Sequence, residues 1–464
     1  MKQYDAIVIG AGQAGGPLAK KLALAGKRTL LVEKRWIGGT CVNDGCTPTK
    51  TMIASARAAY MASHSGPLGV KIKSFSVDMR AIKKRKDDIV HLFRDGSQSG
   101  LEATKNLDVL FGEATFTGDK IISVKPKDGS KVKEFKAGLF YVNTGAKTFI
   151  PKIEGLADIA YLTSTTILDL VEVPEHLLVI GGNYIGLEFG QMFSRFGSKV
   201  TVVEKSGRIV SREDEDVSAE LTKILELEKI NILTNAVTTR LKQKKGGKIT
   251  ATLKVGDKEE KIKCSHVLIA VGRTPQTGTL GLDKTGVKTD ERGNIPVNDK
   301  LETNVKGIYA LGDVKGGPAF THISYNDYTI VYRNLIEKEK LTIKNRPVPY
   351  CMFTDPQLGH IGLSENDAKK QKLNYKVAKL PMEHVARAIE TGDTRGFMKA
   401  IVDADTKKIL GATILGPEGG EIMTILQMAM MGGITYEEIR WNVFAHPLYA
   451  ESLNNLFMAL VNEG

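Results

Sequence analysis

The sequence contains few cysteines and no long apolar segment. Its 464 residues include only Cys41, Cys46, Cys264 and Cys351, which are too few for a disulfide scaffold and are typical of a reducing compartment. No segment approaches the roughly 20 apolar residues that a membrane-spanning helix needs. The apolar run at 6–9 passes into glycines too soon to form a signal peptide. We therefore expect a cytoplasmic protein without a membrane span.

The charge is positive, but it is not concentrated in one region. A net charge of +12 favours an anionic ligand. The basic residues occur in short runs such as 83–86, which are typical of solvated faces, so we do not expect a nucleic-acid partner. Hydrophobic residues make up 42% of the chain, and its length exceeds the roughly 250 to 300 residues at which a single core stops growing. Several folded domains are expected.

Two of the cysteines form a close pair near the N-terminus. Cys41 and Cys46 are followed directly by Thr-Pro-Thr-Lys at 47–50, and an early proline is typical of a helix start. Cys46 would then lie at the positive end of a helix dipole, where the dipole and Lys50 lower a thiol pKa. A disulfide closing so short a loop stabilises a fold by only about 2 kcal/mol. The pair therefore indicates a redox centre, with two reduced cysteines that never pair as the alternative.

A dinucleotide-binding motif opens the chain. A short apolar strand is followed by Gly10, Gly12 and Gly15, then by a helical run and a second strand that ends at Glu33. In such a motif the glycines let the backbone approach a pyrophosphate, the helix N-terminus binds it, and the acid accepts hydrogen bonds from ribose hydroxyls. The complete order of strand, turn, helix, strand and acid makes this prediction specific.

The same pattern recurs later as an internal repeat. Gly181 and Gly186 flank Asn183, which replaces the middle glycine, and the second strand ends at Glu204. Asparagine tolerates a left-handed backbone better than other non-glycine residues, so binding with altered geometry is expected; a unit without a ligand is the alternative. Glu204 would repel a 2′-phosphate and favours NADH, with NADPH as the alternative donor because basic residues follow it closely.

Three further strand-to-turn patterns support two nucleotide domains. Thr144 and Gly145 follow one strand, Gly272 follows another, and Asp313 lies at the end of a third. A carboxylate in the last position could accept a hydrogen bond from a ribityl hydroxyl of a flavin.

Together these residues resemble the flavin-dependent pyridine nucleotide-disulfide oxidoreductases, the family of dihydrolipoamide dehydrogenase, glutathione reductase and mercuric reductase. The match extends from Tyr4 to about Phe457, and its most specific parts are 38–50 and His446-Pro447 with Glu451. The resemblance implies an α/β fold with two Rossmann-like FAD/NAD(P)-binding domains plus a C-terminal α+β dimerisation domain. The expected domains are a discontinuous FAD-binding domain at 1–149 and 278–345, an NAD(P)-binding domain at 150–277, and a dimerisation domain at 346–464.

The resemblance also assigns roles to individual residues. Cys41 would exchange with substrate and Cys46 would contact the flavin, while His446 and Glu451 would form an acid-base pair that reaches the partner subunit's site. Lys50 would pair with Glu188 near the flavin, and Tyr184 would cover the nicotinamide pocket. The predicted cofactor-binding residues are Gly10, Gly12, Gly15, Glu33, Thr40, Lys50, Thr144, Gly145, Gly181, Tyr184, Gly186, Glu188, Glu204, Gly272 and Asp313. No metal site is predicted.

The implied function is that of a homodimeric enzyme that passes hydride from NAD(P)H via FAD to the Cys41–Cys46 disulfide, and on to a disulfide-type small molecule. The segment 42–49 and Asn183 look closer to the mercuric reductase-like group than to dihydrolipoamide dehydrogenase. Mercuric reductases carry a vicinal cysteine pair near the C-terminus, however, and 453–464 contain no cysteine. A metal-ion reductase, an NADH oxidase or quinone reductase that uses the flavin directly, and a non-catalytic binding subunit are the alternatives.

Overall fold

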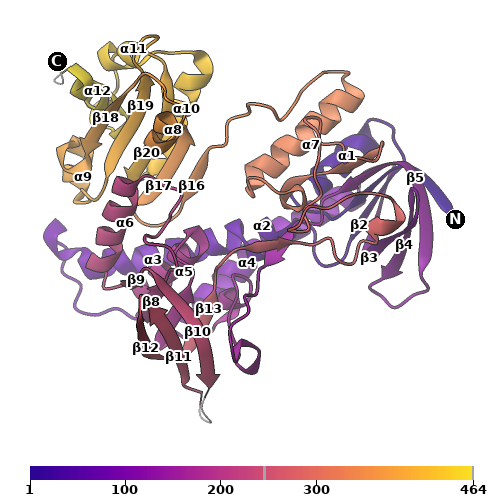
Figure 1. Ribbon diagram of the computed structural model, residues 1–464, viewed down its shortest axis with the longest axis horizontal. Coiled ribbons are helices and arrows are strands. Elements are labelled where there is room, and N and C mark those ends of the chain that lie inside the picture. Colours follow the sequence, from indigo (N-terminus) through magenta and orange to yellow (C-terminus); the bar gives the residue numbers. More distant parts are fainter. Residues whose placement is uncertain (244–246, 462–464) are drawn as a thin grey trace. The chain divides into compact units, whose positions relative to one another are not determined.

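Figure 1 shows a computed structural model of the chain, which describes residues 1–243 and 247–461. The last three residues of the predicted dimerisation domain, 462–464, lie outside the described residues. The chain forms two compact units. Unit 1 comprises Met1–Thr51, Ala81–Phe149 and Gly272–Arg346, and unit 2 comprises Met52–Arg80, Ile150–Val271 and Pro347–Gly464. Residues 52–80, expected in the FAD-binding domain, thus group with unit 2, and 272–277 group with unit 1; the three-domain division stays a prediction.

Unit 1 is built on a six-stranded sheet with the order β1-β2-β3-β4-β5-β15, in which β1 also pairs with β5. Its strands are β1 (Lys2–Ile9), β2 (Thr29–Glu33), β3 (Leu107–Gly118), β4 (Ile121–Pro126), β5 (Lys133–Val142) and β15 (Ile308–Ala310). The ladders of β1 with β2 and β5, and of β5 with β15, are parallel. The apolar run of β1 is fully buried, as expected for a parallel strand covered on both faces.

The helices of unit 1 position the predicted site. Helix α1 (Gly15–Leu24) begins directly after the first glycine turn and packs with α7 (Thr321–Ile336) in one core cluster (Figure 1). The others are α2 (Gly39–Asp44), the start of α3 (Cys46–His64), most of α4 (Met79–Glu102) and a short 3-10 helix, η5 (Gly312–Lys315). The strands β6 (Ala146–Thr148) and β14 (Arg273–Pro275) form an antiparallel ribbon. This ribbon joins the point where the chain leaves unit 1 to the point where it returns.

Unit 2 contains a sheet in which every ladder is parallel, with the order β13-β7-β8-β9. These strands are β7 (His176–Ile180), β8 (Lys199–Val203), β9 (Asn231–Leu233) and β13 (His266–Ile269), and the helices are α5 (Tyr184–Arg195) and α6 (Glu215–Leu227). The same unit contains a separate antiparallel sheet of three strands, β10 (Ala236–Gln243), β11 (Ile249–Val255) and β12 (Lys258–Cys264). The repeat of strand, glycine turn and helix is therefore structural as well as sequential.

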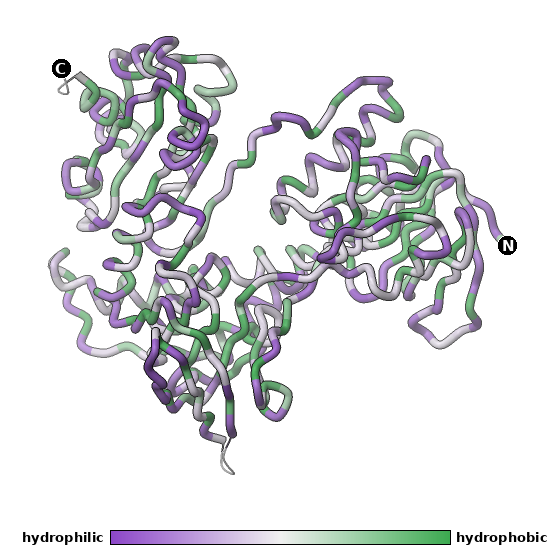
Figure 2. Tube along the Cα trace, in the orientation of Figure 1, coloured by the Kyte–Doolittle hydropathy of each residue, from purple (hydrophilic) through white to green (hydrophobic). Residues whose placement is uncertain are grey.

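The C-terminal part of unit 2 is an antiparallel sheet with the order β16-β17-β20-β19-β18. Its strands are β16 (Tyr350–Met352), β17 (Gln357–Gly362), β18 (Tyr375–Pro381), β19 (Phe397–Asp403) and β20 (Ile409–Gly416); its helices are α8 (Glu365–Lys370), α9 (Ala386–Thr391), α10 (Gly419–Gly432), α11 (Tyr436–Trp441) and α12 (Ser452–Met458). Figure 2 shows hydrophobic stretches running through the strands, and β19 and β20 are almost entirely buried. The predicted fold class is confirmed. Among the described residues, no helix combines the length and apolar composition of a membrane span.

Candidate active site

The two cysteines lie on consecutive helices of unit 1. Cys41 is part of α2, and Cys46 is the first residue of α3, which confirms the predicted helix start. Gly45 separates the helices, and a Cβ atom there would lie 2.8 Å from the carbonyl oxygen of Thr40, so a side chain is excluded. No disulfide joins Cys41 and Cys46 in this structure.

The pair also has a hydroxyl neighbour that the sequence did not reveal. The Sγ of Cys46 lies 3.2 Å from Oγ1 of Thr321, the first residue of α7. A hydrogen bond with Cys46, and then burial, raise the pKa of the Cys41 thiol, whereas Thr321 lowers it. Two such thiols titrate as a pair. Cys46 is exposed at a helix N-terminus, which is a position that favours an anion.

The first glycine turn is shaped to admit backbone contact with a ligand. Gly10 has a φ of +98°, and a Cβ atom on it would lie 2.3 Å from the carbonyl oxygen of Asn143. The side chain of Asn143 accepts a hydrogen bond from the N–H of Gly15 and donates one to the carbonyl oxygen of Leu311, both at 2.8 Å. Asn143 thus ties the turn to the segment that precedes Asp313, a role that the sequence analysis missed.

The acids at the ends of the two motifs have the same geometry. Glu33 accepts hydrogen bonds from the N–H groups of Ala11 and of the residue two positions after the acid, each at 2.7 Å. Glu204 accepts the equivalent pair, from Gly182 and from the residue two positions on, each at 2.8 Å. A carboxylate has about four acceptor positions. Each acid is therefore fixed in place and keeps acceptor capacity for ribose hydroxyls.

Asn183 differs from the expectation for the second motif. Its backbone is extended, with a φ of −114°, rather than left-handed, and its side chain caps α5 by accepting a hydrogen bond from the N–H of Tyr184 at 2.9 Å. Asparagine is a favoured N-cap because its side-chain oxygen satisfies a free N–H of the first helical turn. The replacement of the middle glycine thus begins the helix instead of relieving backbone strain.

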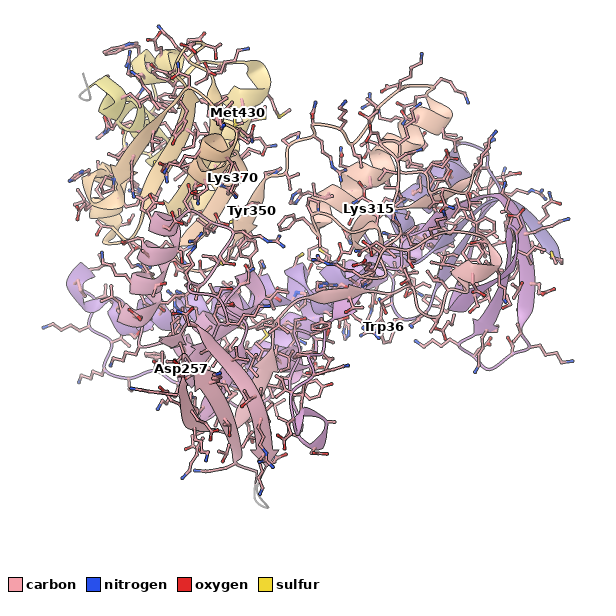
Figure 3. All side chains as sticks on the ribbon, in the orientation of Figure 1. Trp36, Asp257, Lys315, Tyr350, Lys370 and Met430 are labelled. Carbon is pink, nitrogen blue, oxygen red and sulfur yellow. The ribbon has the colours of Figure 1, made fainter. Side chains whose placement is uncertain are left out.

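The turn that carries Asp313 is held by a buried acid. The N–H of Gly312 donates to Asp327, which is fully buried on α7, at 2.8 Å. Asp327 also pairs with Lys315 at 3.2 Å; Lys315 is labelled in Figure 3. Asp313 itself lies 3.6 Å from the guanidinium group of Arg273. Asp327 was missed because an acid within a helix has no local sequence signal.

The residues around the first motif fit a dinucleotide. Within the described part of the chain, Oγ1 of Thr144 and Nε of Arg273 are buried without a hydrogen-bond partner. Buried polar groups are nearly always bonded, so a polar ligand would complete them. The predicted residues Thr144 and Gly145 follow β5, and Gly272 precedes β14, so the ribbon of β6 and β14 brings them to one region of unit 1.

Unit 2 brings together the proposed acid-base pair. Nδ1 of His446 lies 2.9 Å from Oε2 of Glu451, and the imidazole is 69% exposed. Because Nδ1 is engaged by the carboxylate, Nε2 is the nitrogen left for proton exchange. Glu188, on α5, accepts a hydrogen bond from the N–H of Phe353 at 2.8 Å. Its predicted pairing with Lys50 stays a prediction, since Lys50 belongs to unit 1.

The other predicted cofactor-binding residues lie near helix starts, and their binding roles stay predictions. Gly181 and Gly186 flank the start of α5, Tyr184 is its first residue, and Thr40 lies in α2. Among residues 1–243 and 247–461, no group of three or more His, Cys, Asp and Glu side chains could hold a metal ion.

Two dinucleotide motifs on pairs of parallel strands and a thiol pair at a helix N-terminus define a dinucleotide-dependent redox protein. Residues 4–327 match the family model for pyridine nucleotide-disulphide oxidoreductases, and 348–457 match the dimerisation domain of that family. The chain belongs to the pyridine nucleotide-disulfide oxidoreductase family. The family binds FAD and uses NAD(P)H as electron donor. The predictions of family, enzyme class and cofactors are confirmed.

Individual relatives cover nearly the whole chain. It is 36% identical to the probable pyridine nucleotide-disulfide oxidoreductase RclA of Escherichia coli, over 98% of this chain and 99% of that protein. It is 34% identical to a mercuric reductase of Staphylococcus aureus, over 97% of this chain and 81% of that protein. A solved structure, a Cu(II) complex of the HOCl-induced flavoprotein disulfide reductase RclA from Escherichia coli, is similar with a TM-score of 0.90, 35% identity and 99% coverage of both chains.

Proposed function

We propose that the protein is a homodimeric disulfide reductase that uses NADH, FAD and the Cys41/Cys46 pair to reduce a small disulfide-type acceptor. The observation that carries this proposal is the thiol pair itself, with Cys46 at the start of α3 and beside Thr321. A bound flavin would accept hydride from the pyridine nucleotide and deliver two electrons to a disulfide. A structural role would not need two thiols in contact at a helix N-terminus.

The division of labour within the pair follows from its environment. Cys46 would hold negative charge between the N-termini of α3 and α7, whereas Cys41 would attack the acceptor disulfide by thiol–disulfide exchange. The pKa of Cys41 is raised, so this attack requires a base. His446, oriented by Glu451, has the geometry of such a base, and we propose that it serves the partner subunit's cysteines.

NADH is the proposed donor because the acid that follows β8 is fixed by two backbone hydrogen bonds and one of the two nearby cations is already engaged. Glu204 carries negative charge at the ribose position. The guanidinium of Arg208, a nearby cation, is already engaged, since it donates to Glu215 at 2.8 Å and to the carbonyl oxygens of Ser211 and Glu213 at 3.3 and 3.2 Å. The dimerisation domain supports a homodimer, and the low cysteine count supports the cytoplasm as its compartment.

The experiment is a steady-state screen of NADH oxidation by the FAD-loaded protein, with lipoamide, glutathione disulfide, Hg(II), Cu(II) and quinones as acceptors. Cu(II) is included because a similar solved protein was determined as its Cu(II) complex. We expect turnover with a disulfide that disappears in Cys41→Ser. Equal quinone reduction by wild type and Cys41→Ser, with no disulfide turnover in either, would instead establish direct use of the flavin. Turnover with Hg(II) or Cu(II) alone would favour a metal-ion reductase.

A further inference from the structure

Glu213 lies in the turn that leads into α6 and bonds two tyrosines at once. The residue is almost fully buried, at 2% exposure, and its Oε1 accepts hydrogen bonds from the hydroxyls of Tyr184 at 2.7 Å and Tyr350 at 2.8 Å. Tyr184 begins α5, and Tyr350, labelled in Figure 3, begins β16. One carboxylate oxygen thus links the second dinucleotide motif to the C-terminal sheet of the same unit.

A backbone hydrogen bond fixes the turn that carries Glu213 to the second glycine motif. Val210 has a φ of +39°, which is an outlier for a β-branched residue. Its N–H donates to the carbonyl oxygen of Gly182 at 2.9 Å, and the N–H of Glu213 donates to its carbonyl oxygen at 2.8 Å. Such strain persists only where the surroundings enforce it, and it is concentrated at functional sites.

The residue after Glu213 anchors the turn to the C-terminal sheet. Asp214 accepts hydrogen bonds from the N–H groups of Glu365 and Asn366, each at 3.0 Å, and from Nζ of Lys399 at 3.1 Å. Lys399 is buried on β19. Because the turn is fixed on both sides, Glu213 cannot follow a moving side chain, so displacement of Tyr184 must break its bond.

Tyr350 lowers the free-energy cost of breaking the hydrogen bond between Tyr184 and Glu213. A buried carboxylate without a partner is costly, but Tyr350 remains bonded to Glu213 when Tyr184 leaves. Tyr350 is held by stacking on His360, with ring centroids 4.9 Å apart. Burial raises the pKa of both tyrosine hydroxyls, so both stay protonated donors at neutral pH.

We propose that Glu213 and Tyr350 are positioning residues that hold Tyr184 in a resting conformation from which the pyridine nucleotide must displace it. The inference rests on the proposed function, in which Tyr184 covers the nicotinamide pocket. The apparent affinity for the nucleotide then depends on the fraction of protein in which Tyr184 is released. The Tyr184 hydroxyl lowers this released fraction, and the Tyr350 hydroxyl raises it.

Removal of each hydroxyl separates these effects. Tyr184→Phe keeps the ring but removes its bond to Glu213, so the released fraction rises and NAD⁺ binds more tightly. Tyr350→Phe leaves Tyr184 as the remaining tyrosine donor to Glu213. Release of Tyr184 would then leave the buried carboxylate without a tyrosine hydrogen bond, so the released fraction falls and NAD⁺ binds more weakly. A charge-assisted hydrogen bond of this kind corresponds to roughly a tenfold change in Kd in each direction.

The test is calorimetric titration of the FAD-loaded variants with NAD⁺, together with the KM for NADH. We expect Kd and KM to fall in Tyr184→Phe and to rise in Tyr350→Phe. Tyr375→Phe is the matched control: Tyr375 is a half-buried tyrosine of β18, and the tyrosine hydroxyls that bond Glu213 are those of Tyr184 and Tyr350. The Kd of this variant should equal that of the wild type. Shifts in the same direction in both tyrosine variants, or no shift in either, would overturn the inference.

A further variant distinguishes this inference from the function on which it rests. Tyr184→Ala removes the covering ring itself. A changed Kd in Tyr184→Ala, with wild-type values in Tyr184→Phe and Tyr350→Phe, would refute the role of Glu213 but keep Tyr184 at the pocket. A wild-type Kd in Tyr184→Ala would instead refute the assignment of Tyr184.

Discussion

Asn143→Ala should weaken FAD retention, because Asn143 holds the first glycine turn against the segment before Asp313. The residue is 7% exposed, and its side chain makes two hydrogen bonds of 2.8 Å, one accepted from Gly15 and one donated to Leu311. Truncation leaves a buried N–H and a buried carbonyl oxygen without their partner. Each unsatisfied group costs about 1 to 3 kcal/mol, so the variant should lose about 2 to 6 kcal/mol of stability in this region.

The assay compares FAD content after purification, Kd for FAD by fluorescence titration, and thermal unfolding with and without added FAD. Asn143→Asp is the informative partner variant, since it keeps an acceptor for Gly15 but places a buried carboxylate oxygen against the carbonyl oxygen of Leu311, and it should be destabilised at least as much as Asn143→Ala. A wild-type Kd for FAD together with a wild-type melting temperature in Asn143→Ala would refute the reasoning. A loss of melting temperature that FAD does not reverse is the expected outcome.

Three further predictions concern the thiol pair, its base and the donor. Thr321→Val removes the hydroxyl that lies 3.2 Å from the Sγ of Cys46 and lowers the pKa of Cys41. The thiolate absorbance of the reduced cysteine pair should therefore develop at higher pH than in Thr321→Ser, and coincident titrations would contradict this. His446→Gln should lower turnover with a disulfide by roughly 10² to 10⁴-fold, whereas flavin reduction by NADH, measured by stopped flow, should be retained. Glu451→Gln should have a smaller effect on turnover. Equal losses in both half-reactions would exclude His446 as the base. Wild type should have a higher kcat/KM with NADH than with NADPH, and Glu204→Ser should reduce the difference; a wild-type preference for NADPH would count against Glu204 as the discriminating acid.

Local patterns were sufficient to predict two nucleotide-binding units and most motif positions, whereas the fold class came from the resemblance to a known family. The two glycine motifs could be read because each depends on the order of strand, turn and helix within about 25 residues, where chain geometry limits what can follow. The start of α3 at Cys46 could be read because proline has a strong positional preference. Asn183 was identified as the unusual position, but its role as an N-cap was not predicted, since asparagine suits both a cap and a left-handed turn.

The residues that hold the site together were decided by the tertiary structure. Each of these residues forms a hydrogen bond with a segment distant in sequence, and its sequence neighbours do not predict that contact. They are Asn143, Asp327, Thr321, and Glu213 with Tyr350. Their contacts form only when strands and helices have packed, because a buried polar group must find its partner in three dimensions. The sequence alone determined which chemistry the chain carries, in the spacing of its glycines and the Cys41/Cys46 pair. Only the packed structure decided which side chains hold those groups in position.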